Sequence, residues 1–173
     1  MNSKILKPQF FERDSILVAK ELLGKFLVRK IKNKLIKSEI TEVEVYDGLK
    51  DKGSHAWRGK TKRTFVMFGP AGKWYVYLNY GMHWMLNIVT QKENYPAAIL
   101  IRGVRGINGP GRVTKFFKIN KFFNNKKANK KTGLWIEDGG IKINSSKIHH
   151  GPRIGIDYAG NYWKKRHLRF WVD

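Results

Sequence analysis

Apolar residues in this chain occur mainly in short runs bounded by glycine, asparagine or proline, a pattern that predicts strands more often than helices. The segments with this pattern are residues 26–31, 35–46, 75–87, 97–102, 134–137, 153–156 and 168–172. A helical spacing of apolar residues between Asp14 and Gly24, and a segment from Pro110 to Lys118 after a glycine-rich turn, predict helices. The pattern favours an α+β fold with an antiparallel-rich mixed sheet and flanking helices, and we expect one domain over residues 1–173.

Residues 75–87 are typical of two strands joined by a turn at Tyr80, which places a large aromatic side chain at the tip of a protruding β-hairpin. By the two-residue period of a strand, Tyr75, Tyr77 and Asn79 share one face, and the residues between them face the core. A basic protein can use an aromatic at such a tip to wedge between stacked bases. The alternative is that Tyr80 folds back over the hairpin and packs as a core residue.

The strand at residues 35–46 brings two carboxylates close to an aromatic residue. Ile40, Glu42, Glu44 and Tyr46 share one of its faces by the same period. A carboxylate among apolar neighbours is a candidate general base, because burial raises its pKa towards the working pH. The alternative is that both glutamates are solvated and pair with lysines, and spacing alone does not say which glutamate matters.

Glycine-rich loops follow two of the predicted strands. His55 lies in the loop at residues 47–73, where a histidine can stack on a ligand or simply lie at the surface. Residues 103–111 match neither the Walker nor the dinucleotide pattern, which leaves a nest of backbone amides for one DNA phosphate or a plain tight turn. The Lys- and Asn-rich residues 121–132 predict a mobile, solvated loop.

The 173 residues include 35 Lys and Arg against 13 Asp and Glu, for a formal net charge of +22. Such an excess implies a polyanionic partner, and nucleic acid is favoured over a membrane surface because no clean basic amphipathic helix is found. The absence of cysteine excludes disulfides, thiolate zinc sites and a cysteine nucleophile, and the five histidines show no metal-binding spacing. No apolar run is long enough for a membrane span or a signal peptide, so a soluble cytoplasmic protein is expected.

Several short motifs occur in order between about Leu22 and Val172. They are Glu42-Val-Glu-Val-Tyr-Asp-Gly48, Asp51-Lys-Gly-Ser-His55, Met67-Phe-Gly-Pro70, Tyr75-Val-Tyr-Leu-Asn-Tyr-Gly-Met-His83, Asn87, Ile99-Leu-Ile-Arg102, Asn108-Gly-Pro-Gly111 and Pro152-Arg-Ile-Gly-Ile156. Each motif alone is weak, but the ordered set resembles the alkyladenine (3-methyladenine) DNA glycosylase family. The segment between Arg102 and Asn108 is shorter than is usual in that family, and Thr64 stands where asparagine is common.

The resemblance implies a base-flipping enzyme that needs no cofactor and no metal. Glu44, rather than Glu42, matches the general base, and Arg102 and the backbone carbonyl of Ile154 match groups that hold the attacking water. The residues that match the pocket around the flipped base are Tyr46, His55, Tyr77 and Asn87, of which Asn87 obstructs the 2-amino group of guanine. Tyr80 matches the residue that fills the vacated gap, with Met82 beside it. The residues that match positions near the DNA backbone and groove are Arg63, Met67 and Arg112.

The predicted function is therefore that of a monofunctional DNA glycosylase of base excision repair, acting as a monomer on double-stranded DNA that contains alkylated purines. No lysine matches a Schiff-base nucleophile, so no lyase activity is expected. One alternative is a non-catalytic basic nucleic-acid-binding protein, for which charge and surface aromatics suffice. Another is an enzyme that acts on a different polyanion, such as a nucleotide or RNA hydrolase.

Overall fold

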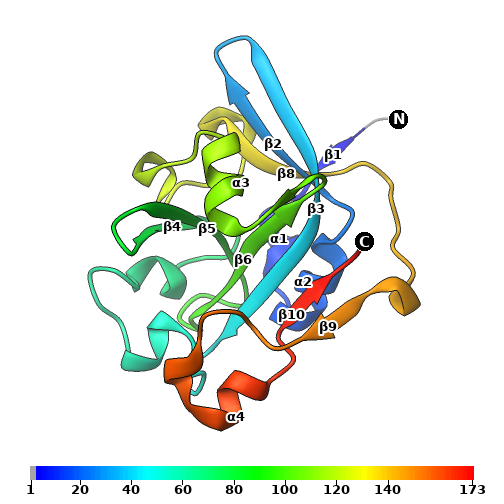
Figure 1. Ribbon diagram of the computed structural model, residues 1–173. Helices are drawn as coiled ribbons and strands as arrows, with labels where there is room; N and C mark the ends of the chain where they lie inside the picture. Colours follow the sequence, from blue (N-terminus) through cyan, green and yellow to red (C-terminus); the bar gives the residue numbers. More distant parts are fainter. Residues whose placement is uncertain (1–2) are drawn as a thin grey trace.

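The computed structural model describes residues 3–173 of the chain (Figure 1). Its strands are β1 (Lys4–Ile5), β2 (Phe26–Ile31), β3 (Lys34–Asp47), β4 (Trp74–Asn79), β5 (His83–Val89), β6 (Ala97–Val104), β7 (Ile107–Asn108), β8 (Leu134–Asp138), β9 (His149–Gly151) and β10 (Arg169–Trp171). Its α-helices are α1 (Pro8–Phe11), α2 (Ser15–Leu22), α3 (Pro110–Phe116) and α4 (Gly160–Lys165). Its 3-10 helices are η1 (His55–Arg58), η2 (Phe65–Phe68), η3 (Lys121–Phe123), η4 (Lys130–Thr132), η5 (Ser145–Lys147) and η6 (Asp157–Ala159).

The strands form one sheet in the order β1-β8-β2-β3-β6-β5-β4, with β7 paired to β6, and β10 paired to both β3 and β9. Within residues 3–173 every pairing between these strands is antiparallel. The predicted α+β class, with a mostly antiparallel sheet and flanking helices, is therefore confirmed.

The long strand β3 joins two parts of this sheet, one that contains β1, β8 and β2 and one that contains β6, β5 and β4. Its first half pairs with β2 as a hairpin that extends to the top of Figure 1. Its second half pairs with β6 on one side and with β10 on the other. Both parts of the sheet therefore share one strand, and the candidate base Glu44 lies in its second half.

The main core is built from alternate residues of the strands and from the buried faces of α2 and α3. Val45, Ile99, Ile88 and Trp74 stand opposite one another across β3, β6, β5 and β4, and all are fully buried. Since successive strand residues point to opposite faces, the intervening residues of the same strands are free to line a site. Helix α2 starts where predicted, because the Asp14 side chain accepts a hydrogen bond from the backbone N–H of Leu17.

Ile40 was predicted to share one face of β3 with Glu44 and Tyr46, but it lies on the opposite face. Ile40 packs in the main core together with Val43 and Val45. The pairing register between β3 and β6 shifts on both sides of Glu42, and such a bulge reverses the alternation of side chains. The prediction for Ile40 was wrong because the two-residue period assumed a regular strand.

Two other expectations are corrected. Residues 153–156 form a bend rather than a strand, and β9 ends before them at Gly151. Residues 121–132 are not a free loop: the backbone N–H of Asn125 donates to the carbonyl of Trp74, that of Ala128 donates to Gly72, and Phe123 is buried in the core. Lys and Asn are frequent in this segment, but its backbone pairs beside the edge strand β4 and shields it.

The glycine-rich residues 103–111 form a tight turn. Gly103 and Val104 end β6, and β7 folds back on them through Gly106, whose φ of 78° suits glycine. Helix α3 begins directly afterwards, at Pro110. The tight turn is therefore observed, and a nest of backbone amides for one DNA phosphate stays a prediction.

Candidate active site

The face of the sheet opposite the core is the floor of a cavity of about 780 Å³. Glu44, Leu100, Asn87 and Tyr75 stand opposite one another across β3, β6, β5 and β4, so they form a single row on this floor. The walls come from the segment between β3 and β4 and from the segment that leads into α4, which lie together in the lower part of Figure 1. Residues far apart in sequence thus surround one row of strand residues.

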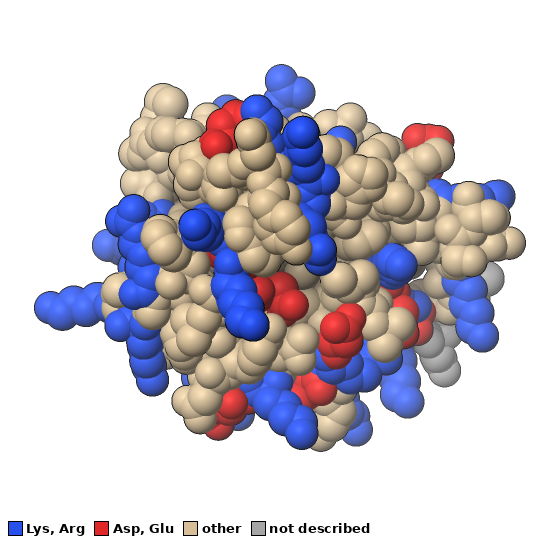
Figure 2. All heavy atoms as spheres, turned by 90° about the horizontal axis from the view of Figure 1, so that it is seen from below, with Lys and Arg blue, Asp and Glu red and all other residues tan. Residues whose placement is uncertain are grey.

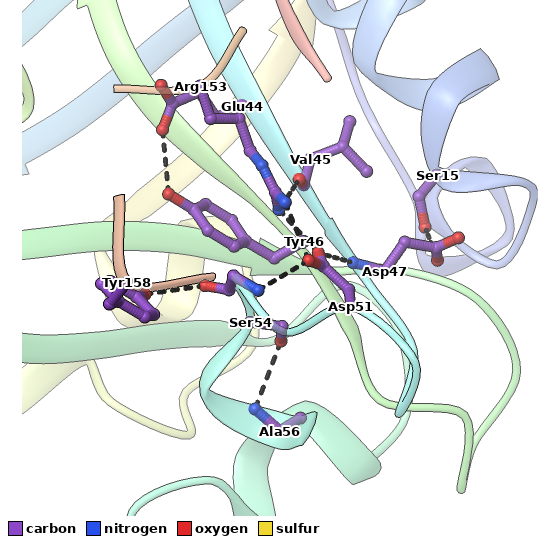
Figure 3. Close-up of polar contacts among 11 residues, drawn as sticks. Ser15, Glu44, Val45, Tyr46, Asp47, Asp51, Ser54, Ala56, Arg153 and Tyr158 are labelled. Carbon is purple, nitrogen blue, oxygen red and sulfur yellow. Dashed lines mark hydrogen bonds and ion pairs between the residues drawn. The ribbon is translucent and has the colours of Figure 1, made fainter. Parts of the chain in front are cut away.

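Glu44 is fully buried at the bottom of this cavity, with an exposed fraction of 0%. One carboxylate oxygen, Oε1, accepts a hydrogen bond from the backbone N–H of Ile154 at 2.8 Å and lies 3.4 Å from Nη1 of Arg102. The other oxygen, Oε2, accepts a hydrogen bond from the Tyr46 hydroxyl at 2.9 Å (Figure 3). Both oxygens are therefore fixed by donors from three different parts of the chain.

Burial dominates the electrostatics of this carboxylate. Desolvation raises the pKa of Glu44 above its ordinary value, although Arg102, the Ile154 N–H and the Tyr46 hydroxyl each lower it. Burial and the neighbouring Glu44 also raise the pKa of Tyr46 well above its usual range, so its hydroxyl stays a donor. A fixed carboxylate with a raised pKa has the properties of a general base near neutral pH.

The predicted pocket aromatics Tyr46, His55 and Tyr77 all line the cavity, together with Tyr75. The His55 ring is 4.6 Å from the Tyr77 ring in an edge-to-face arrangement, and its Nδ1 shares a hydrogen bond of 3.0 Å with the Tyr75 hydroxyl. Burial, with a further contribution from Arg63, lowers the pKa of His55 to about 4. His55 is therefore a neutral, half-buried ring of the cavity wall and not a freely solvated surface histidine.

Asn87 lies on the floor, two strands from Glu44. Its side-chain Nδ2 donates to the backbone carbonyl of Tyr75 at 3.1 Å, which fixes the orientation of the amide. The residue is buried and lines the cavity. A fixed amide at this depth fits the screening role that the resemblance implies, and that role stays a prediction.

The tip of the β4–β5 hairpin lies at the rim of the cavity. Tyr80 has a left-handed backbone, with φ of 48°, and its side chain is 83% exposed. Met82, two residues on, is also exposed. The alternative that Tyr80 folds back into the core is therefore wrong for this structure, because the ring lies in solvent.

Arg102 reaches the cavity from β6 and contacts both candidate glutamates. Its Nε donates to Oε1 of Glu42 at 3.2 Å, while its Nη1 faces Glu44. Glu42 is also paired with Arg169 at 3.0 Å and does not line the cavity. The structure thus separates the two glutamates, one buried on the floor and one turned towards arginines.

The three residues expected near the DNA backbone and groove have different environments. Arg63 lines the cavity, and its guanidinium carbon lies 4.9 Å from the centre of the Tyr77 ring. Arg112 is exposed in the first turn of α3. Met67 is only 2% exposed, packs with Tyr75 in a second small core and is among the residues that line the cavity, and its expected position near the DNA stays a prediction.

Sequence reasoning missed the buried ion pair that holds the cavity walls together. Arg153 Nη1 and Nη2 lie 2.6 and 2.8 Å from the two carboxylate oxygens of Asp51, and Nη1 also donates to the carbonyl of Val45 (Figure 3). The guanidinium carbon of Arg153 lies 4.8 Å from the centre of the Tyr46 ring. Asp51 and Arg153 are 102 residues apart in sequence, and no local pattern couples them.

Tyr158 is a second residue that the sequence did not single out. It lines the cavity near the start of α4, and its hydroxyl donates to the carbonyl of Gly53 at 3.0 Å (Figure 3). Most of its ring is exposed. It therefore offers an aromatic surface at the mouth in addition to Tyr80.

Basic side chains project over the face of the molecule seen in Figure 2, with a few acidic groups among them. Arg58, Arg63 and Lys52 are among the cavity-lining residues.

Among residues 3–173 no group of three or more potential acidic or histidine ligands could hold a metal ion. The described helices include none that is long and apolar enough to cross a membrane.

Known proteins resemble this chain along most of its length. The family model for methylpurine-DNA glycosylase matches residues 9–109 and 104–173. A Legionella pneumophila (strain Paris) protein named "Putative 3-methyladenine DNA glycosylase" is 42% identical over 98% of this chain and 94% of its own length. Proteins with the same name from Rickettsia felis and Rickettsia rickettsii (strain Sheila Smith) are 46% and 44% identical over 90% of this chain and 89% and 86% of their own lengths. This chain belongs to the methylpurine-DNA glycosylase family.

Proposed function

We propose that this protein flips an alkylated purine out of double-stranded DNA into the cavity and cleaves its N-glycosidic bond with a water activated by Glu44. As a family member it is a DNA-3-methyladenine glycosylase, a hydrolase of N-glycosyl bonds. The observation that carries the mechanism is the fully buried, doubly anchored Glu44 on the floor of an aromatic-lined cavity. In this proposal the protein acts as a monomer on the DNA of the cell.

Entry of the base requires a nucleotide to leave the stack, because the glycosidic bond is not accessible inside a duplex. The exposed Tyr80 ring at the hairpin tip supports a wedge that occupies the gap left by the flipped nucleotide. The hairpin holds this ring at the rim of the cavity that would receive the base. Insertion of the ring and capture of the base can thus occur together.

Recognition of the base follows from the rings of the cavity wall. A purine alkylated at the 3- or 7-position is cationic, and its ring is attracted to the faces of Tyr46, Tyr77 and the neutral His55. A positively charged histidine in the same place would repel it. Asn87 on the floor would limit access for a base that carries a 2-amino group.

Hydrolysis would use Glu44 in two ways. As a carboxylate it accepts a proton from the attacking water, and its charge stabilises the positive sugar that develops at C1′. Arg102 and the backbone carbonyl of Ile154 would hold this water beside the carboxylate. The departing alkylated purine needs little help, because it leaves as a neutral molecule.

The first test is release of base from methylated duplex DNA. We expect the wild-type protein to release 3-methyladenine, identified by chromatography, and to leave abasic sites without strand cleavage. Strand cleavage would require a lysine that forms a Schiff base with the sugar, and such a lysine is usually desolvated. Lys52 lines the cavity but is exposed, so this reaction is not expected. Release should fall roughly 10²- to 10⁴-fold in Glu44→Gln.

Binding of the same duplex provides the control for this variant. Glutamine preserves the shape of the side chain and its contact with the Ile154 N–H, so the affinity for DNA should be largely kept. Near-full release by Glu44→Gln would show that the general base has been assigned wrongly. Binding without any release by the wild-type protein would favour the non-catalytic alternative.

A further inference from the structure

We propose that Glu42 is a positioning residue for Arg102, and that it sets how much of the arginine's charge reaches Glu44. The inference rests on the proposed function, in which Glu44 is the general base. Glu42 and Glu44 both face the guanidinium of Arg102, but only Glu44 lines the cavity. Glu42 would therefore act on the reaction through Arg102 and without touching the DNA.

The two glutamates compete for one arginine. Oε1 of Glu42 accepts a hydrogen bond from Nε of Arg102 at 3.2 Å. Glu44 has only an ion-pair contact of 3.4 Å with Nη1 of the same guanidinium, with no hydrogen bond between them. The arginine is thus held more closely by the glutamate outside the cavity than by the one inside it.

The bulge in β3 makes this arrangement possible. The register shifts on both sides of Glu42, which is paired with Gly103, the residue next to Arg102. A Cβ at position 103 would lie only 3.1 Å from Cβ of Glu42, so the glycine leaves room for the glutamate. Bulges often redirect a side chain beside an active site, and here the bulge brings Glu42 beside Arg102.

Arg169 fixes Glu42 from the other side. Its Nη1 donates to Oε1 of Glu42 at 3.0 Å, its Nε donates to the carbonyl of Pro152 at 2.9 Å, and its guanidinium stacks on Trp171 at 4.3 Å. Ile154, the donor to Glu44, lies two residues after Pro152. Arg169 is therefore linked to Glu44 by two routes. One runs through Glu42 and Arg102, and the other runs through the backbone from Pro152 to Ile154.

Glu44 is surrounded by few other charged or titratable groups. Arg102 approaches it from β6, Arg153 acts on it from the bend after β9, Tyr46 donates to it from β3, and Tyr77 lies near it on β4. Glu42 is the nearest group that can divert the charge of Arg102. When Glu42 is neutral, Glu44 is the carboxylate that remains beside Arg102.

The Glu42→Gln variant tests the inference through the pH profile of single-turnover release from methylated duplex DNA. Loss of the negative charge and closer pairing with Arg102 both make Glu44 a weaker base. We expect the plateau rate to fall about tenfold and the acid limb of the profile to move down by about one pH unit. Glu42→Asp restores the charge and should return the acid limb towards the wild-type position.

Glu39 provides a matched control on the same strand. It pairs with Arg105 at 3.1 Å, its side chain is as exposed as that of Glu42 at 15%, and it contacts neither Arg102 nor Glu44. Glu39→Gln should keep both the rate and the acid limb. Circular dichroism and thermal unfolding of all three variants would establish that they are folded.

The outcomes separate the inference from the proposed function. An unchanged profile in Glu42→Gln would overturn the positioning role, and so would a slower rate with the acid limb unmoved or shifted upwards. Equal effects of Glu39→Gln and Glu42→Gln would overturn it as well. Absence of base release by the wild-type protein would instead overturn the proposed function itself, and the positioning role with it.

Discussion

Burial acts on the titratable side chains of the cavity in opposite directions. It raises the pKa of Glu44, an acid, and lowers that of His55, a base, because in both cases the charged form is disfavoured. The result is a carboxylate with a raised pKa and a neutral imidazole in the same cavity. At this scale Glu44 and Glu42 have the same chemistry, and only their surroundings give them different roles.

His55 should make the stability of the protein depend on pH. The unfolded pKa is 6.5 and the folded pKa is about 4, so below pH 6.5 the unfolded chain binds a proton that the folded chain does not. The free energy of unfolding should therefore fall as the pH falls from about 6.5 to about 4. In denaturant titrations, His55→Asn should lose less stability than the wild type over this window, by roughly 1–3 kcal/mol. Parallel curves for the two proteins would contradict a neutral His55 in the folded state.

The β4–β5 hairpin uses its two faces for different purposes. Tyr75, Tyr77 and Asn79 line the cavity, while Trp74 and Val76 are buried in the core. Leu78, near the tip, is partly exposed and not in the core, because the sheet ends there. The hairpin is therefore anchored at its base and free at its tip, where Tyr80 lies.

Tyr80→Ser should weaken binding to a lesion-containing duplex by a few kcal/mol at most, because the proposed wedge in the vacated gap would be lost. Since the ring lies in solvent, thermal stability should be almost unchanged. Phe122→Ser is a suitable control, because Phe122 is also exposed but does not line the cavity. Equal affinities of the wild type and Tyr80→Ser would remove the wedge from the mechanism.

At the scale of the whole molecule, the excess of positive charge determines how the protein meets a duplex. The net charge is +22, and arginine and lysine line the cavity as well as the face in Figure 2. Such a surface attracts DNA of any sequence and positions the protein before a damaged base is found. In the proposed function, selectivity for the damaged base then comes from the cavity.

Binding to undamaged duplex DNA should therefore depend strongly on salt. The logarithm of the affinity should fall linearly with the logarithm of the salt concentration, with a slope of about −0.9 for each phosphate contacted. Fluorescence anisotropy with a labelled duplex between low and physiological salt would measure it. A flat response would count against DNA as the partner.

Local patterns predicted those elements whose own residues determine their structure. The strand at residues 26–31 and the start of α2 after Asp14 are where the sequence placed them, because alternation and capping act over a few residues. Residues 153–156 have the same apolar pattern as a strand but form a bend. There Arg153 pairs with Asp51 and Ile154 donates to Glu44, and both partners lie about a hundred residues away.

The sequence by itself determined the charge, the antiparallel hairpins and the ordered motifs from which the family resemblance follows. It also determined which residues are candidates for chemistry. Only the tertiary structure decided that Glu44 is buried while Glu42 turns to Arg102 and Arg169, and that Tyr80 is exposed while Met67 is not. The physical reason is that burial and the sharing of charge depend on strands and loops that meet in space, whereas a sequence pattern records only the neighbours along the chain.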